Sequence, residues 1–290
     1  MTPFDAETGK IDTACLIQLL EHHVAAGTDN LCILGTTGEA SVLTMAERKH
    51  VLETAVKTVK GKIPILAGTG TINPIATKEM TQQALDLGCD AALVVSPYYV
   101  KPPQRALVKL FLETADLGLP VILYNVPGRT GCNILDETIA TCAAHPNIVG
   151  VKDATGDLQR LDSLREKLKG VDDNFLCYSG DDATSVDFIL NGGHGCISVT
   201  ANVAPKAMHD MVAAALAGDA EKARALNEPL TGLHKDLFCE ANPIPAKWAV
   251  YRAGWISSPY CRPPLDTMDP KFESLVEAAM KKAGVLTAVH

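Results

Sequence analysis

The sequence predicts an α/β protein that folds as a (β/α)8 TIM barrel and continues into a helical extension at its carboxyl end. Short apolar runs rich in β-branched residues alternate with amphipathic helical patterns along most of the chain. These runs begin roughly every 20–35 residues, which is the spacing of repeated strand–helix units. The chain has 290 residues, of which 47% are hydrophobic, and this suffices for a barrel of typical size.

An open, doubly wound parallel sheet is the alternative arrangement of the same units. That fold carries a glycine-rich phosphate fingerprint after its first strand. Here the nearest match, Gly68-Thr69-Gly70, continues with Asn73 where the third glycine belongs. The missing fingerprint therefore favours the closed barrel.

Strands are predicted where a short apolar run is followed by glycine, proline or polar residues. These runs cover residues 30–34, 63–67, 91–95, 121–124, 148–152, 175–178 and 195–199. Another strand should precede them, and only its carboxyl end, Thr2-Pro3-Phe4, is present. We therefore expect most of the first barrel strand to be missing.

Helices are predicted where apolar residues recur at helical spacing after a capping residue. Thr44 and Glu47 form a capping box, and Asn73 precedes a proline at the first helical position. The barrel helices cover residues 12–27, 44–61, 73–88, 104–117, 136–143, 157–167, 181–190 and 205–216. Helices over residues 219–237, 243–252 and 270–284 follow them. We therefore predict a barrel over residues 1–217 and a helical domain over residues 218–290.

Composition argues against several functional classes. The net charge of -8, without a basic cluster, argues against binding of nucleic acid and against a polybasic membrane anchor. No apolar run is long enough to predict a membrane-spanning helix. The nine cysteines are odd in number and scattered, so neither a disulfide framework nor a zinc site is expected. We expect a cytoplasmic protein, or a plastid stromal one whose transit peptide has been removed.

Lys152 occupies the most informative position in the chain. It ends the apolar run 148–152 and is the only lysine at the carboxyl end of a predicted strand, where barrels carry their reactive residues. A lysine that loses hydration in such a site can act as an amine nucleophile and form a Schiff base. On position alone, an equally good interpretation is that Lys152 leaves the strand and extends into water.

Hydroxyl and guanidinium groups follow several of the other predicted strands. These groups belong to Thr36, Thr37, Tyr99, Tyr124 and Arg129. Hydroxyls can transfer protons and bind carboxylates, and arginine can bind a carboxylate through two parallel hydrogen bonds. The sequence has no metal-ligand cluster at these positions, so the set favours carbonyl chemistry on a small keto acid without a metal or cofactor. Structural interpretations remain open for three of these places. The glycines beside Thr36 and Thr37 could serve only a tight turn, Tyr124 could be a core aromatic residue, and Arg129 could be a solvated turn residue.

Three segments closely resemble the dihydrodipicolinate synthase family of class I, Schiff-base-forming aldolases. They are Gly35-Thr36-Thr37-Gly38-Glu39, Tyr124-Asn125-Val126-Pro127-Gly128-Arg129-Thr130-Gly131 and Gly150-Val151-Lys152-Asp153-Ala154-Thr155-Gly156. Residues 179–182, 192–199 and 242–245 match as well, and the likeness runs from Thr2 to about Leu286. The resemblance implies a (β/α)8 barrel that condenses pyruvate with L-aspartate 4-semialdehyde to 4-hydroxy-tetrahydrodipicolinate, in lysine biosynthesis by the diaminopimelate pathway.

The resemblance also implies a role for each candidate residue. Lys152 would form the Schiff base, and Tyr124 would exchange protons through the Thr36 hydroxyl with Tyr99, which reaches in from a neighbouring subunit. The substrate-binding positions would be Thr37, Gly180, the backbone of Ile197 and, for the carboxylate of the semialdehyde, Arg129. A homo-oligomer, either a dimer or a tetramer, is implied, with no cofactor.

Lysine-sensitive members of that family bind lysine in an interface pocket with histidines and an acidic residue. The matching positions here are occupied by Met45, Arg48 and Thr77, while Ser41, Asn73 and Tyr98 keep the pocket partly polar. Because an acidic partner for the lysine ammonium is lost, we expect weak or absent inhibition by lysine.

Two rival functions fit parts of the same pattern. One is another Schiff-base pyruvate lyase, such as N-acetylneuraminate lyase, but Arg129 in its Gly-Arg-Thr-Gly turn argues against a sugar-acid substrate. The other is a catalytically inactive barrel retained as a binding subunit. All the reactive positions are filled, which disfavours this second alternative.

Overall fold

The computed structural model describes residues 1–286, and the chain divides into two compact units. One unit comprises residues 65–197, and the other comprises residues 1–64 together with 198–290. In residues 1–286, no helix has both the length and the apolar composition needed to cross a membrane.

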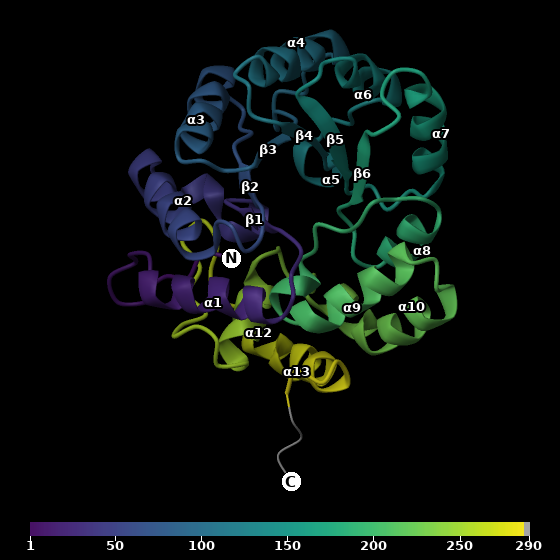
Figure 1. The fold of residues 1–290 in the computed structure, drawn as a ribbon. Helices are drawn as coiled ribbons and strands as arrows, with labels where there is room; N and C mark the ends of the chain where they lie inside the picture. Colours follow the sequence, from purple (N-terminus) through teal and green to yellow (C-terminus); the bar gives the residue numbers. More distant parts are fainter. Residues whose placement is uncertain (287–290) are drawn as a thin grey trace. The chain divides into compact units, whose positions relative to one another are not determined.

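Residues 65–197 form parallel strands that pair in chain order, with helices outside them (Figure 1). The strands are β2 (Ile65–Gly68), β3 (Ala91–Val95), β4 (Val121–Asn125), β5 (Ile148–Asp153) and β6 (Leu176–Ser179). The helices are α3 (Pro74–Asp86), α4 (Gln104–Ala115), α5 (Pro127–Thr130), α6 (Asp136–Ala143), α7 (Gln159–Leu168) and α8 (Ser185–Leu190). The alternation predicted from hydrophobic periodicity is confirmed for all five strands and for these helices except α5.

The sheet core is apolar because parallel strands are covered on both faces. All five residues of β4 are buried, and Ile148 and Val151 of β5 are nearly inaccessible. Gly150 is required between β5 and β6, since a Cβ at this position would lie 2.6 Å from the Leu176 carbonyl oxygen. The strands that carry the candidate site are therefore packed too closely for a larger residue there.

Two boundaries in this unit differ from the prediction. Residues 195–199 do not form a strand, and only Cys196 makes a parallel bridge, to Ser179. Gly195 has φ +145°, which interrupts the extended backbone that a ladder needs. Helix α8 begins at Ser185 rather than 181, because the Asp181 carboxylate accepts from the Thr184 amide at 3.0 Å and stabilises a turn there.

The other unit contains helices from both ends of the chain. Its elements are α1 (Thr13–Ala25), β1 (Leu31–Ile33), η1 (Thr36–Gly38), η2 (Ala40–Val42), α2 (Met45–Val59), η3 (Thr200–Asn202), α9 (Pro205–Leu216), α10 (Ala220–Asn227), η4 (Glu228–Leu230), α11 (Thr231–Asp236), α12 (Ile244–Arg252), η5 (Pro270–Phe272) and α13 (Glu273–Lys282). The predicted capping box is confirmed, since the Thr44 hydroxyl accepts from the Glu47 amide and the Glu47 carboxylate accepts from the Thr44 amide. The Asn73 cap of α3, in the first unit, is confirmed too.

Two predictions for this unit were wrong in detail. The helix predicted over 219–237 is divided into α10, η4 and α11, and Pro229, which has no N–H to continue the helical ladder, lies at the division. Thr2-Pro3-Phe4 forms no strand ladder among the described residues. Phe4 instead makes an antiparallel bridge to Ile11, with its ring fully buried.

His23 of α1 makes the stability of this unit sensitive to acid. His23 is 9% exposed as a residue, its Nδ1 lies 3.0 Å from the Thr28 hydroxyl, and burial lowers its pKa from 6.5 to about 3. Between these values the unfolded chain binds a proton that the folded chain does not, so stability falls as the pH falls below 6.5.

We expect His23→Gln to flatten this dependence. The wild type should lose about 1 kcal/mol of stability from this residue between pH 7 and about pH 5.5, and the variant should lose less. Thermal unfolding at the two pH values measures the difference. His50→Gln, which changes an exposed histidine of α2, serves as the control and should keep the wild-type slope. Equal slopes for wild type and His23→Gln would contradict the assignment.

Candidate active site

Lys152 and Tyr124 lie side by side at the carboxyl ends of β5 and β4. The two residues are paired in the strand register, so their side chains leave the sheet on the same face. The Lys152 Nζ lies 4.5 Å from the centroid of the Tyr124 ring, and Tyr124 is 8% exposed. Lys152 is half-buried, and its amine lies against the face of the Tyr124 phenol ring. This contact argues against the interpretation that Lys152 simply extends into water.

The strand on the other side of Lys152 restricts the space around its side chain. Lys152 is in register with Tyr178 of β6, and burial raises the pKa of that phenol, which keeps it protonated. A Cβ at Gly180 would lie 2.8 Å from the Lys152 Cε. Glycine at position 180 therefore leaves room for the lysine side chain. The Ile197 amide donates to the Ser179 carbonyl at 2.9 Å, which places this predicted binding position beside the end of β6.

Tyr99 and Arg129 lie further out on the same unit. Tyr99 has φ +72°, a left-handed conformation that is unusual for an aromatic residue, and 86% of its surface is exposed. Its amide donates to the Thr130 carbonyl at 3.3 Å, which connects it to the short helix α5 that carries Arg129. Arg129 is also exposed. The structure thus presents the tyrosine ring outward, away from the chain's own core.

Thr36 and Thr37 belong to the other unit, on η1. Thr36 is exposed, and the Thr37 hydroxyl accepts from the Asn242 side-chain amide at 3.0 Å. The Thr2 hydroxyl donates to the Gly38 carbonyl at 2.7 Å. The two threonines are therefore presented by a short 3-10 turn that side chains from both ends of the chain hold in place.

A buried ion pair supports this turn, and the sequence analysis missed it. Glu39 follows the turn with φ +54° and is 2% exposed, and its carboxylate pairs with the ammonium of Lys247, which is 0% exposed. The Arg262 amide donates to the other Glu39 oxygen at 2.9 Å. Burial lowers the pKa of Lys247, and the Glu39 carboxylate opposes that shift. A lysine inside the apolar segment of α12 was the available signal, because a buried lysine requires a partner.

The positions predicted to match a lysine pocket have diverse environments. Ser41 and Met45 are exposed, whereas Arg48 is 5% exposed and burial lowers its pKa to about 10. In the first unit, Asn73 caps α3 through the Ile75 amide, and the Tyr98 hydroxyl lies 3.1 Å from the Thr71 hydroxyl. Asn73 thus has a structural role that requires no ligand.

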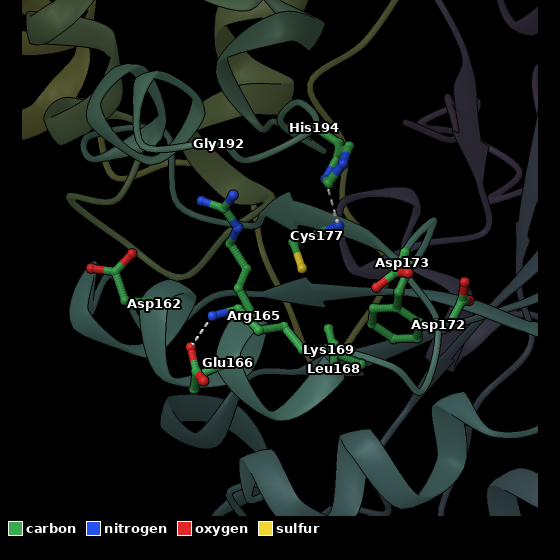
Figure 2. A pocket seen from close by; sticks show the side chains of 11 residues that line it. Asp162, Arg165, Glu166, Leu168, Lys169, Asp172, Asp173, Cys177, Gly192 and His194 are labelled. Atoms are coloured by element: carbon green, nitrogen blue, oxygen red, sulfur yellow. Dashed lines mark hydrogen bonds and ion pairs between the residues drawn. The ribbon is translucent and has the colours of Figure 1, made fainter.

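A surface pocket of about 470 Å³ lies elsewhere on residues 65–197 (Figure 2). It is lined by residues of α7, the loop before β6, Cys177, Gly192 and His194, and its lining does not include Lys152 or Tyr124. Its charges are mixed, with Arg165 and Lys169 among several carboxylates. Across residues 1–286, no cluster of His, Cys, Asp and Glu side chains is suited to holding a metal ion.

Comparison with known proteins identifies the relatives of this chain. Residues 1–283 match the model of the Dihydrodipicolinate synthetase family. The chain is 47% identical over 287 residues to a 4-hydroxy-tetrahydrodipicolinate synthase of Pseudomonas aeruginosa, covering 99% of this chain and 97% of that protein. It is 48% identical to the enzyme of the same name from Alcanivorax borkumensis, covering 99% and 96%.

Solved structures agree with this relationship. The chloride-inhibited dihydrodipicolinate synthase of Acinetobacter baumannii, complexed with pyruvate, superposes with a TM-score of 0.95 at 44% identity, covering 99% of this chain and 97% of that one. The dihydrodipicolinate synthase of Cyanidioschyzon merolae with lysine bound superposes with a TM-score of 0.93 at 34% identity, covering 99% and 96%. The predicted fold class, a (β/α)8 barrel with helices at the carboxyl end, is confirmed by these matches. The chain belongs to the dihydrodipicolinate synthetase family.

Proposed function

We propose that this chain condenses pyruvate with L-aspartate 4-semialdehyde to give 4-hydroxy-tetrahydrodipicolinate, in lysine biosynthesis by the diaminopimelate pathway. Membership of the family and nearly full-length similarity to synthases support the proposal. The observation that carries it is the placement of a half-buried lysine amine against a tyrosine ring at the carboxyl ends of two barrel strands.

Lys152 is the nucleophile in the proposed mechanism. Its neutral amine attacks the ketone carbon of pyruvate, and loss of water from the carbinolamine leaves an imine. Removal of a methyl proton converts the imine to an enamine, whose carbon attacks the aldehyde of the second substrate. The amino group of that substrate then closes the ring by displacing Lys152, which regenerates the free enzyme.

Tyr124 is the proposed proton donor and acceptor for these steps. Its ring lies against the Lys152 amine, which supports a role for its hydroxyl in proton transfer near that amine. The Thr36 hydroxyl would connect Tyr124 to Tyr99 of a neighbouring subunit, consistent with the outward exposure of Tyr99. A positioned acid–base group of this kind contributes about 10²–10⁴-fold to rate.

The remaining candidate residues bind substrate in this proposal. Thr37, Gly180 and the backbone of Ile197 hold pyruvate, and Arg129 binds the carboxylate of the semialdehyde. The active protein would be a homodimer or homotetramer in the cytoplasm, with the barrel over residues 1–217 and the helical domain over residues 218–290. No metal or cofactor takes part in any step.

Mass-spectrometric detection of product formation tests this function. Pyruvate and L-aspartate 4-semialdehyde together should yield a product of the mass of 4-hydroxy-tetrahydrodipicolinate. N-acetylneuraminate, offered alone, should not be cleaved to pyruvate. Cleavage of the sugar acid without condensation would replace the proposed function by that of a sugar-acid lyase.

We expect lysine to inhibit this enzyme weakly or not at all. The positions that match a lysine pocket hold Met45, the buried Arg48 and the buried Thr77, none of which supplies a carboxylate for the ligand ammonium. Initial rates measured over a lysine titration check this expectation. Inhibition at sub-millimolar lysine would contradict it.

A further inference from the structure

A polar cluster lies directly behind the Lys152–Tyr124 pair. Asn125 and Asp153 follow these two residues in the chain and are paired with each other across β4 and β5. Because side chains alternate along a strand, Asn125 and Asp153 leave the sheet on the face opposite to Lys152 and Tyr124. Asn125 is 0% exposed, so its amide must find its partners inside the protein.

The Asp153 carboxylate is saturated by four donors. The Asn125 amide donates to Oδ2 at 3.0 Å, and the Arg160 Nε lies 3.2 Å from the same oxygen. The Thr155 amide donates to Oδ1 at 2.9 Å, and the Thr155 hydroxyl donates to it as well. The carboxylate next to the nucleophile is thereby held on the outer face of the sheet.

Arg160 of α7 connects the Asp153 carboxylate to the segment between α5 and the first residue of α6. Its Nη1 donates to the Asn133 side chain at 2.9 Å, and its Nη2 donates to the Ile134 carbonyl at 2.9 Å and pairs with Asp136 at 2.9 Å. Asn125 completes the cluster, donating to Asn133 at 2.8 Å and accepting from the Ile134 amide at 2.9 Å. The Arg160 side chain is 16% exposed.

We propose that Arg160 is a positioning residue for the reaction, a role that rests on the proposed function. A planar guanidinium has five donors in a rigid fork, and here the fork holds Asp153 at the end of β5 and Asn133, both of which accept from the Asn125 amide at the end of β4. It also fixes residues 133 and 134, which follow the short helix that carries Arg129. One side chain thus sets the spacing of the nucleophile, the proton donor and the carboxylate-binding arginine without touching substrate.

The expected effect of removing Arg160 follows from the steep dependence of the catalytic rate on the positions of the reacting groups. A displacement of about 1 Å at reacting groups can cost about 10²-fold in rate. We therefore expect Arg160→Ala to lower kcat by about 10–100-fold. Arg160→Lys should recover little, because an ammonium on a flexible stem cannot span Asp153 and the Asn133–Ile134 segment together.

Asp136→Asn is the matched control. Asp136 contacts the same guanidinium and its side chain is similarly buried, 13% exposed against 12% for Asp153, but it lies on α6 rather than at a strand end. Losing this contact should lower the melting temperature and leave kcat within about twofold of wild type. If the loss of kcat were only a consequence of lower stability, it would appear in Arg160→Ala and Asp136→Asn alike.

The experiment measures kcat, KM for each substrate and melting temperature for the three variants, with and without millimolar guanidinium chloride. Guanidinium can fill the space left in Arg160→Ala and should raise its kcat several-fold, without raising that of wild type or Asp136→Asn. Full kcat in Arg160→Ala, or equal losses of kcat in Arg160→Ala and Asp136→Asn, would overturn the positioning role.

A second readout separates this proposal from the proposed function. Trapping with pyruvate and borohydride reports Schiff-base formation without the aldehyde. Absence of an adduct on the wild type would sink the proposed function itself. A wild-type adduct that forms as fast on Arg160→Ala would leave that function standing and remove Arg160 from the positioning of Lys152.

Discussion

Lys152→Ala is expected to lower kcat by at least about 10³-fold, as removal of a covalent nucleophile does. The side chains in register with Lys152 on the two neighbouring strands are Tyr124 and Tyr178, neither of which is an amine. Intact-mass spectrometry after pyruvate and borohydride should show one pyruvate-sized adduct on the wild type. The variant should show none.

Lys152→Arg distinguishes the role of the Lys152 amine as a nucleophile from the role of its positive charge. Arginine keeps a cation at this position but stays protonated, so it cannot attack a carbonyl. It should therefore be as inactive as the alanine variant and form no adduct. Lys101→Ala, which changes an exposed lysine near Tyr99, is the control and should retain the adduct. An adduct on Lys152→Ala would assign the Schiff base to another lysine.

Lys247→Met is expected to destabilise the fold by about 3–5 kcal/mol, because it leaves the buried Glu39 charge without its partner. The Lys247 ammonium also donates to the Tyr260 carbonyl at 3.0 Å and lies 4.3 Å from the centroid of the Phe4 ring. Chemical denaturation with urea measures the loss as a lower midpoint. Because Glu39 follows the turn of Thr36 and Thr37, catalytic activity should fall together with stability.

The double variant Lys247→Met with Glu39→Gln tests the cause. It removes both charges, so it should be more stable than Lys247→Met alone. Lys281→Met breaks a solvent-screened pair with Glu277 and should lower the urea midpoint far less than Lys247→Met does. If the double variant were less stable than Lys247→Met alone, an unpaired carboxylate would not be the source of the loss.

Most of the secondary structure was predictable because it depends on neighbours in the chain. The helix over residues 136–143 and the strand over 91–95 were predicted to the residue, and the capping box at Thr44 forms as expected. The prediction failed where a local pattern was incomplete. Residues 195–199 have the apolar composition of a strand, but the conformation of Gly195 leaves a single bridge.

The candidate site was predictable only in part, and Lys152 shows where the division lies. Its position at a strand end could be read from the apolar run, whereas its contact with Tyr124 depends on the register of two strands. The partners of Arg160 were not predictable, since nothing in the residues around it distinguishes it from the other charged residues of an amphipathic helix. A close resemblance to a family supplied the roles that periodicity could not.

The sequence by itself determined the alternation of strands and helices, the position of the reactive lysine and the family. The alternation and the lysine position depend on residues a few positions apart in the chain. The family depends on sequence segments that can be compared directly with those of other proteins. Only the tertiary structure decided which charges are buried together. Glu39 and Lys247 are 208 positions apart, and Asp153 is joined to both Arg160 and Asn125. Burying a charge without a partner costs free energy, so buried charges are found in pairs. That cost arises only in the folded protein, where the charge is removed from water.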